Sequence, residues 1–253
     1  DLLRYAAWLV EQLEAIGKAR AAGADPGDAY DAHKARTAAR NAAMSASARD
    51  IGELPEVVDP ARKAKASGDF KCFCETYFPA AFTLPWSEDH LKVIAKIEQA
   101  VLAGGLFAHA MPRGSGKTTL TETACIWAIL IGARPYVSLI SSTAERARSM
   151  LESIKTELEC NELLAEDFPE AVYPIHRLER IHNRANGQTY GGAPTRITWT
   201  IDKVILPTIP ESKASGAIIT VTGLTGEGIR GQKHKQADGT VVRPSLVVLD
   251  DPQ

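Results

Sequence analysis

The sequence has few cysteines, few aromatic residues and no long apolar run. Its four cysteines, Cys72, Cys74, Cys125 and Cys160, do not form two pairs at the spacing of zinc ligands. We therefore expect free thiols in a reducing compartment rather than a disulfide framework or a zinc site. The apolar runs are too short to cross a bilayer, and no basic and then apolar leader follows Asp1, so no secretory signal is expected.

A large excess of charge is also missing. The 29 lysines and arginines against 31 acidic residues give a net charge of −2. This balance excludes a uniformly basic, histone-like surface but is compatible with a local basic patch. The length of 253 residues and the hydrophobic fraction of 45% are enough for a substantial core in a globular protein.

Residues 1–52 are expected to form a small helical N-terminal region. An apolar stripe predicts a helix over residues 1–22, and Gly23 ends it. Asp25 and Pro26 then predict the start of a second, alanine-rich helix that reaches about Asp50. Its thin apolar face allows two interpretations, a solvated arm or an element that docks on a partner. The stripe consists of Leu2, Ala6, Leu9, Leu13 and Ile16.

Residues 53–69, with their prolines, glycine and charge cluster, are expected to be a linker, and residues 70–253 to be the main domain. From residue 106 onward strand and helix patterns alternate, which predicts an α/β fold with a mostly parallel sheet and helices on both of its faces. Strands are predicted at 106–111, 135–142, within 195–208, at 217–223 and at 245–251, with helices over 118–131 and 143–160. A hairpin is expected between residue 231 and the last strand.

The segment 110–119, with the sequence AMPRGSGKTT, has the pattern of a phosphate-binding loop between a strand and a helix. Gly114 and Gly116 allow the backbone N–H groups to curl around an anion, and the helix that follows adds its positive dipole end. Lys117 is expected to reach the β- and γ-phosphates of a nucleotide, and the Thr118 hydroxyl to bind Mg²⁺. Ser115 and Thr119 complete the expected loop, although Met111 replaces the usual first glycine.

The strand at 246–249, with four apolar residues, is expected to be central and buried, and it ends in Asp250 and Asp251, at the edge where ligands bind in open α/β sheets. Asp250 is expected to hold the Mg²⁺ ion, and Asp251 to orient or deprotonate the attacking water. A solvated strand end is the alternative for this pair. Arg113, inside the loop, either stabilises charge on the γ-phosphate or forms an ion pair with one of these acids.

Together these motifs resemble the large terminase subunit of tailed bacteriophages and prophages, the ATPase that pumps DNA into the procapsid. The resemblance covers about residues 69–253 and rests on residues 111–118, including Arg113, and on residues 249–253. It implies a P-loop NTPase fold of the RecA-like type, with ATP and Mg²⁺ as cofactors. The chain has two acidic residues, Asp250 and Asp251, where the family often has Asp-Glu, so the reach of Asp251 to the water is shorter.

Further positions match the family pattern. Trp86 and His90 fall where the family contacts adenine; His90 takes the place of a common glutamine, and a core role is the alternative for Trp86. Arg230 in Ile229-Arg230-Gly231 resembles an arginine that acts on the nucleotide of a neighbouring subunit. Its alternative is a surface arginine that holds its own loop.

The resemblance implies a motor that moves double-stranded DNA, in the host cytoplasm and without a membrane. Its implied partners are a small terminase subunit, a portal protein and further copies of the chain in a ring of five. The family's nuclease domain would follow Gln253, so no nuclease activity is expected of these residues. A helicase-like ATPase and a nucleotide-binding module without turnover remain alternatives. Two basic clusters are candidates for contact with DNA: Arg177, Arg180, Arg184 and Arg196, and Arg230, Lys233, His234, Lys235 and Arg243.

Overall fold

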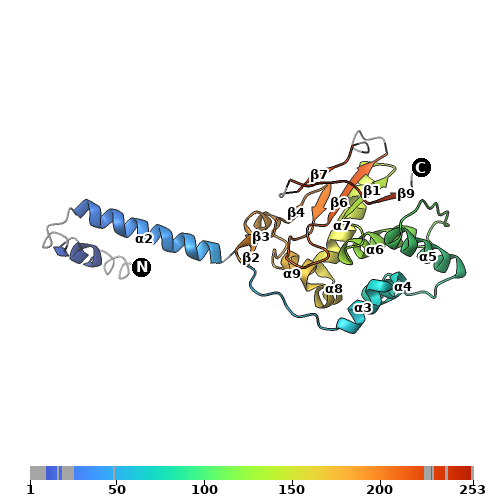
Figure 1. Ribbon diagram of the computed structural model, residues 1–253, viewed down its shortest axis with the longest axis horizontal. Coiled ribbons are helices and arrows are strands. Elements are labelled where there is room, and N and C mark those ends of the chain that lie inside the picture. Colours follow the sequence, from blue (N-terminus) through green and yellow to red (C-terminus); the bar gives the residue numbers. More distant parts are fainter. Residues whose placement is uncertain are drawn as a thin grey trace. The chain divides into compact units, whose positions relative to one another are not determined.

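The computed structural model describes residues 10–15, 17–18, 26–47, 49–224, 229, 231–236 and 239–251 (Figure 1). The chain divides into two compact units, residues 1–50 and residues 51–253. In the first unit residues 10–15 and 17–18 are helical, and α2 spans Pro26–Ser47. The side chains of residues 30–41 are all exposed, and so is Leu13, so the described part of this unit has no core of its own. The other members of the predicted stripe, Leu2, Ala6, Leu9 and Ile16, lie outside the described residues.

The second unit is an α/β domain whose helices start at sequence-encoded caps. Asp59, Asp69, Ser87, Thr143 and Asn161 each accept a hydrogen bond from a backbone N–H in the first turn of the helix that follows. The helices are α3 (Pro60–Gly68), α4 (Phe70–Tyr77), α5 (Glu88–Leu102), α6 (Lys117–Leu130), α7 (Ala144–Cys160), α8 (Glu162–Asp167) and α9 (Pro169–His176), followed by the 3₁₀ helix η1 (His182–Gly187).

Residues 53–69, expected to be a linker, contain α3 in their second half. Ala66 of this helix is fully buried, and its carbonyl accepts a hydrogen bond from the indole of Trp127 in α6. Phe70 packs on the same indole with ring centroids 5.1 Å apart. The helical layer therefore includes α3 and α4 as well as the two helices predicted further along the chain.

A five-stranded sheet in the order β4-β5-β6-β1-β9 forms the second layer. β1 (Tyr136–Ser141) pairs in parallel with β6 (Ile218–Gly223) on one side and with β9 (Leu246–Asp250) on the other. β5 (Lys203–Ile205) is antiparallel to β6 and to β4 (Thr198–Trp199). The sheet is therefore mixed, because the segment 195–208 folds back on itself as two short strands. Two further pairs are β2 (Thr189–Tyr190) with β3 (Ala193–Pro194), and β7 (His234–Lys235) with β8 (Val241–Val242); the second is the predicted hairpin.

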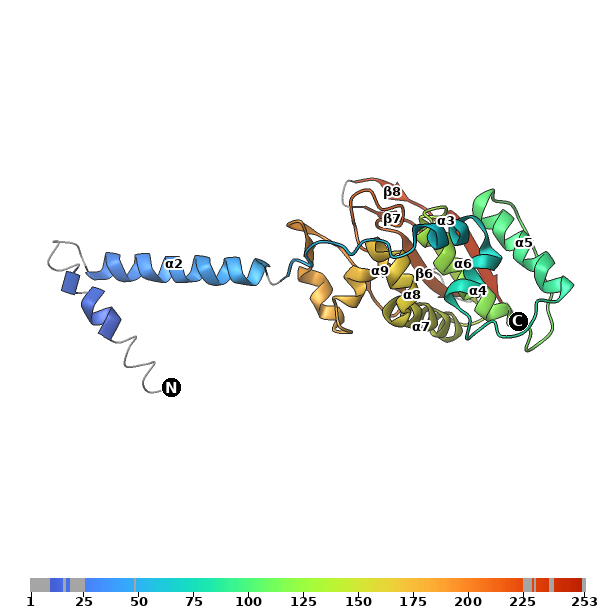
Figure 2. The ribbon, with the colours of Figure 1, turned by 90° about the horizontal axis from the view of Figure 1, so that it is seen from below.

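The expectation of helices on both faces of the sheet is wrong for the described residues. α6 and α7 contact both the sheet and each other; the helices of this unit lie below the strands in Figure 1 and overlap them in Figure 2, which is seen from below. On the opposite face Val242 of the hairpin packs on a small cluster of Tyr136, Ile205 and Ile218. The reason lies in the connections, since the chain passes from β6 to β9 through a hairpin instead of a helix.

Two strand predictions also need correction. Residues 106–111 form no strand, and Leu106 is almost fully exposed, because no described strand lies beside this segment to supply hydrogen bonds. β9 is an edge strand of the described sheet and not a central one. Its side chains alternate between partly buried Leu246 and Val248 and exposed Val247 and Leu249.

Candidate functional site

The loop before α6 has an open curl. Gly114 and Gly116 have φ values of +77° and +76°, in the left-handed region that favours glycine. Ser115 closes the turn, as its backbone N–H and its hydroxyl both donate to the Pro112 carbonyl. Gly116 caps α6 and offers no side chain to the first N–H groups of the helix. These donors and the helix dipole face the loop without a side-chain competitor, an arrangement suited to an anion.

Thr118, in the first turn of α6, meets the end of β9. Its Oγ1 donates a hydrogen bond of 3.0 Å to Oδ2 of Asp250, which is buried. Parallel pairing of β9 with β1 places Asp250 beside Ser141, at the carboxyl edge of the sheet. The structure thus brings the end of the glycine loop and the acidic strand end into direct contact, although they are far apart in the sequence.

Asp251 lies between two cations. Its Oδ1 is 3.6 Å from Nζ of Lys117, and its Oδ2 is 3.3 Å from Nη1 of Arg146. Asp251 has a φ of +44°, which is uncommon for a residue other than glycine and turns the chain sharply after the strand. Arg146 also donates to the Ser142 hydroxyl, which fixes the guanidinium at the end of β1.

No sequence motif marks Arg146 as a residue of this site. The available signal was its position, since it follows the polar residues 141–143 in the first turn of α7, directly after a strand that neighbours β9. Any cation in that turn is close to the acidic strand end.

Arg113 is exposed and forms no hydrogen bond or ion pair with a described residue, so the expected alternative of an ion pair to Asp250 or Asp251 does not occur there. Thr119 is half-buried in the first turn of α6. Arg230 lies outside the described residues, which leaves its predicted role without a position in the structure.

Trp86 and His90 lie next to the loop. Nε2 of His90 donates to the Ser115 carbonyl at 2.9 Å, and Nδ1 is 2.6 Å from the Ser87 hydroxyl. Trp86 meets the His90 ring edge-on with centroids 6.0 Å apart, and its indole N–H donates to Glu75. Trp86 is half-buried against the core, so the segment before α5 is joined to the glycine loop through His90.

A third carboxyl group near the loop is that of Glu122, which lies one helical turn beyond Thr118 in α6. Glu122 is half-buried, and burial raises its pKa to about 7; a hydrogen bond with Ser153 opposes this shift, and the negative charge of Asp250 adds to it. The sequence analysis missed Glu122 because a glutamate inside an apolar helix has no motif around it. Its spacing of four residues from Thr118 was the only signal.

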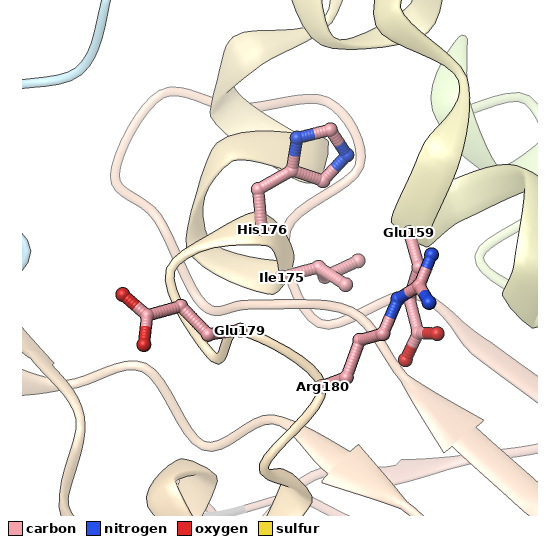
Figure 3. A pocket seen from close by; sticks show the side chains of 5 residues that line it. All are labelled: Glu159, Ile175, His176, Glu179 and Arg180. Carbon is pink, nitrogen blue, oxygen red and sulfur yellow. The ribbon is translucent and has the colours of Figure 1, made fainter.

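Two members of the first basic cluster, Arg180 and Arg184, have contacts of their own. Arg180 donates to Sγ of Cys160, and Arg184 forms an ion pair with Glu179. A hollow of about 290 Å³ lies here, and Arg180 and Glu159 approach each other on one side of it while Glu179 points away (Figure 3). Glu159 also pairs with His182. Arg180, Glu179 and Glu159 thus bind residues that do not line the hollow, whereas the buried Nε2 of His176 has no hydrogen-bond partner among the described residues.

The residues at the loop are chemically suited to a magnesium–nucleotide complex. The Thr118 hydroxyl and the Asp250 carboxylate supply adjacent hard oxygen donors, which Mg²⁺ prefers, and Mg²⁺ usually takes its other oxygens from water and phosphate. An added Cβ at Gly114 or Gly116 would meet no atom within 4 Å, so space is open above the loop. In the described part of the chain no group of three or more His, Cys, Asp and Glu side chains is placed to hold a metal by itself.

Comparison of the chain with protein-family models, with curated proteins and with solved structures gave no match. The resemblance to terminases therefore rests on the motifs alone. Within the described residues, no helix has the length and apolar character needed to cross a membrane.

Proposed function

We propose that the chain is a magnesium-dependent ATPase, the motor part of a terminase large subunit that moves double-stranded DNA. The observation that carries this proposal is the 3.0 Å hydrogen bond from Thr118 to Asp250. It joins the end of a glycine loop to a buried carboxylate at the carboxyl edge of a sheet, the two halves of a site for a triphosphate and its metal. The P-loop NTPase fold is part of the proposal.

In the proposed site the loop N–H groups and Lys117 bind the β- and γ-phosphates, and Thr118 and Asp250 hold the magnesium ion. When bound, the ion neutralises charge that develops on the phosphate oxygens. Asp251 accepts a proton from the attacking water, which requires that a phosphate take over its contact with Lys117. Arg113, exposed and unpaired among the described residues, is placed in the loop where it can approach the γ-phosphate.

The remaining partners of the proposal come from the resemblance: a portal protein, a small terminase subunit and a ring of subunits in which Arg230 serves the neighbour. A nucleotide-binding module without turnover is the second candidate. It is favoured by the two cations that hold Asp251, because these ion pairs occupy the carboxylate oxygens that would have to receive the proton.

Steady-state ATP hydrolysis tests the proposal. The Lys117→Ala variant is expected to lose turnover by at least about 100-fold, since it removes a cation aimed at transition-state charge. Lys92→Ala is the matched control; Lys92 is exposed on α5 and paired with Asp89. Its turnover should equal that of the wild type.

Two results separate the candidates. Wild-type protein that binds ATP but hydrolyses it no faster than Lys117→Ala, with double-stranded DNA present, supports the module without turnover. Equal loss of turnover in both lysine variants contradicts a specific role for the loop.

A further inference from the structure

A second basic feature lies at the opposite end of the sheet from Asp250. A hollow of about 800 Å³ is bordered by β4, β5, the 208–216 loop and the β7–β8 hairpin. We call it the basic groove and define it by Arg196, Thr198, Thr208, Ser215, His234 and Lys235. It unites residues from the two basic clusters, which the sequence alone leaves separate. Because β4 and β9 are the two outer strands of the sheet, the groove is distinct from the candidate nucleotide site.

The cations of the basic groove have no acidic partner among the described residues. Arg196 and Lys235 form no ion pair there, whereas Arg184 is paired with Glu179. Lys203 of β5 is close enough to His234 that its positive charge, after burial, lowers the pKa of that histidine. No described residue that lines the groove carries a carboxylate. The groove therefore concentrates positive charge that no described residue neutralises.

The backbone holds Arg196 at the groove in a strained conformation. Its φ is +56°, in the left-handed region, and its side chain is exposed between buried Thr195 and Ile197. Hydrogen bonds on both sides fix Thr195: its N–H donates to the Gln188 carbonyl, and its own carbonyl accepts from Thr208. A strained and exposed cation held by buried neighbours is typical of a functional position.

We propose that the basic groove binds the phosphate backbone of double-stranded DNA. Its cations and hydroxyls suit phosphate oxygens, and its volume is far larger than a single phosphate needs. No described Phe, Tyr or Trp lines it, so it lacks the stacking surface that single-stranded DNA uses. This inference rests on the proposed function for its choice of DNA, and it gives that function a contact surface independent of base sequence.

The test is binding of a fluorescent DNA duplex, without nucleotide, at several salt concentrations. The double variant Arg196→Ala/Lys235→Ala should bind roughly tenfold more weakly, and the slope of log affinity against log salt should fall by about 1.8, because two phosphate contacts are lost. The control Arg180→Ala/Arg184→Ala removes the same charge from residues that do not line the groove and should bind like the wild type. Thermal unfolding of both variants checks that they are folded.

Equal affinity and slope in the wild type and the groove variant would overturn the inference, as would an equal loss in the control variant. Tighter binding of a single strand than of the duplex would overturn the choice of duplex. Basal ATP hydrolysis without DNA is measured in parallel. If the protein binds DNA through the groove but does not hydrolyse ATP, only the proposed ATPase is refuted. If the protein hydrolyses ATP and the groove variant binds DNA as tightly as the wild type, only the groove is refuted.

Discussion

Asp167 and Asp250 are both buried carboxylates, yet their surroundings differ. Asp167 receives hydrogen bonds from Nε and Nη2 of Arg62, from the hydroxyl of Tyr77 and from the N–H of Asp59. Asp250 accepts one side-chain hydrogen bond from a described residue, that of Thr118. A carboxylate has about four acceptor positions, so those of Asp167 are all used, whereas Asp250 still has unused ones among the described residues.

This difference separates a structural acid from one available to a ligand. Burial by itself would raise the pKa of Asp167, but the Arg62 and Tyr77 hydrogen bonds outweigh it and hold the pKa below the ordinary value. The network ties α3 and α4 to the end of α8 and leaves no room for another partner. Asp250 has oxygen lone pairs without a partner among the described residues, beside a glycine loop, where the proposed metal and phosphate chain would need them.

The largest expected effect is on stability, at Asp167. Asp167→Ala leaves Arg62 and the buried Tyr77 hydroxyl without their acceptor, so the free energy of unfolding should fall by about 3 kcal/mol. Asp250→Ala removes one hydrogen bond and should cost about 1 kcal/mol or less. Urea unfolding of both variants measures the difference.

Tyr77→Phe provides a milder control if Asp167→Ala does not fold. It removes one of the donors to Asp167 and should cost about 1 kcal/mol. Equal destabilisation by Asp167→Ala and Asp250→Ala would show that saturation does not distinguish the two acids.

Glu122 extends the comparison to a carboxyl group whose pKa is raised to about 7. The pKa of Glu122 is near 4.5 in the unfolded state, so between pH 4.5 and pH 7 the folded state binds more protons than the unfolded state. The contribution of Glu122 to stability is therefore greatest at low pH and falls as the pH rises toward 7. We expect a loss of about 2 kcal/mol between pH 5 and pH 8, which Glu122→Gln should largely abolish. Thermal and urea unfolding across this range measure it, with Glu56→Gln as the control because Glu56 is exposed. An unchanged pH profile in Glu122→Gln would contradict the assignment.

Arg146 offers a smaller test, on activity. Arg146→Ala removes one of the two cations on Asp251, and we expect ATP turnover to change by roughly tenfold with stability nearly unaffected, since exposed ion pairs contribute little. Arg148→Ala is the matched control, because Arg148 lies on the same helix but pairs with Asp202. A change of equal size in both variants would place the effect outside Asp251.

Much of this fold follows from local patterns in the sequence. The predicted 143–160 helix is confirmed, and its apolar residues at helical spacing, Ala147, Met150, Leu151, Ile154 and Leu158, are all buried in α7. β1 and β6 are confirmed as well, because their apolar and β-branched runs lie between clear turn signals. The hairpin before β9 is also confirmed.

The errors concern relations between elements. Residues 106–111 have the apolar pattern of a strand, but no described strand lies beside them. A local pattern does not determine whether another strand is present to pair with the segment. The covering of the second sheet face depends on Val242 meeting Tyr136, which is a long-range contact. Asp250 could be predicted because it belongs to a local motif. Arg146 and Glu122 could not, because their proximity to the site depends on the packing of α6, α7 and β9.

The central claim is that Thr118 and Asp250 hold a magnesium ion shared with a nucleotide. Equilibrium titration of ATP with and without Mg²⁺, on the wild type and on Thr118→Ala and Asp250→Ala, tests it most directly. We predict that Mg²⁺ tightens ATP binding to the wild type, and that this dependence disappears in both variants while the fold is retained. Binding to the wild type that is indifferent to Mg²⁺, or an unchanged Mg²⁺ dependence in both variants, would contradict the account.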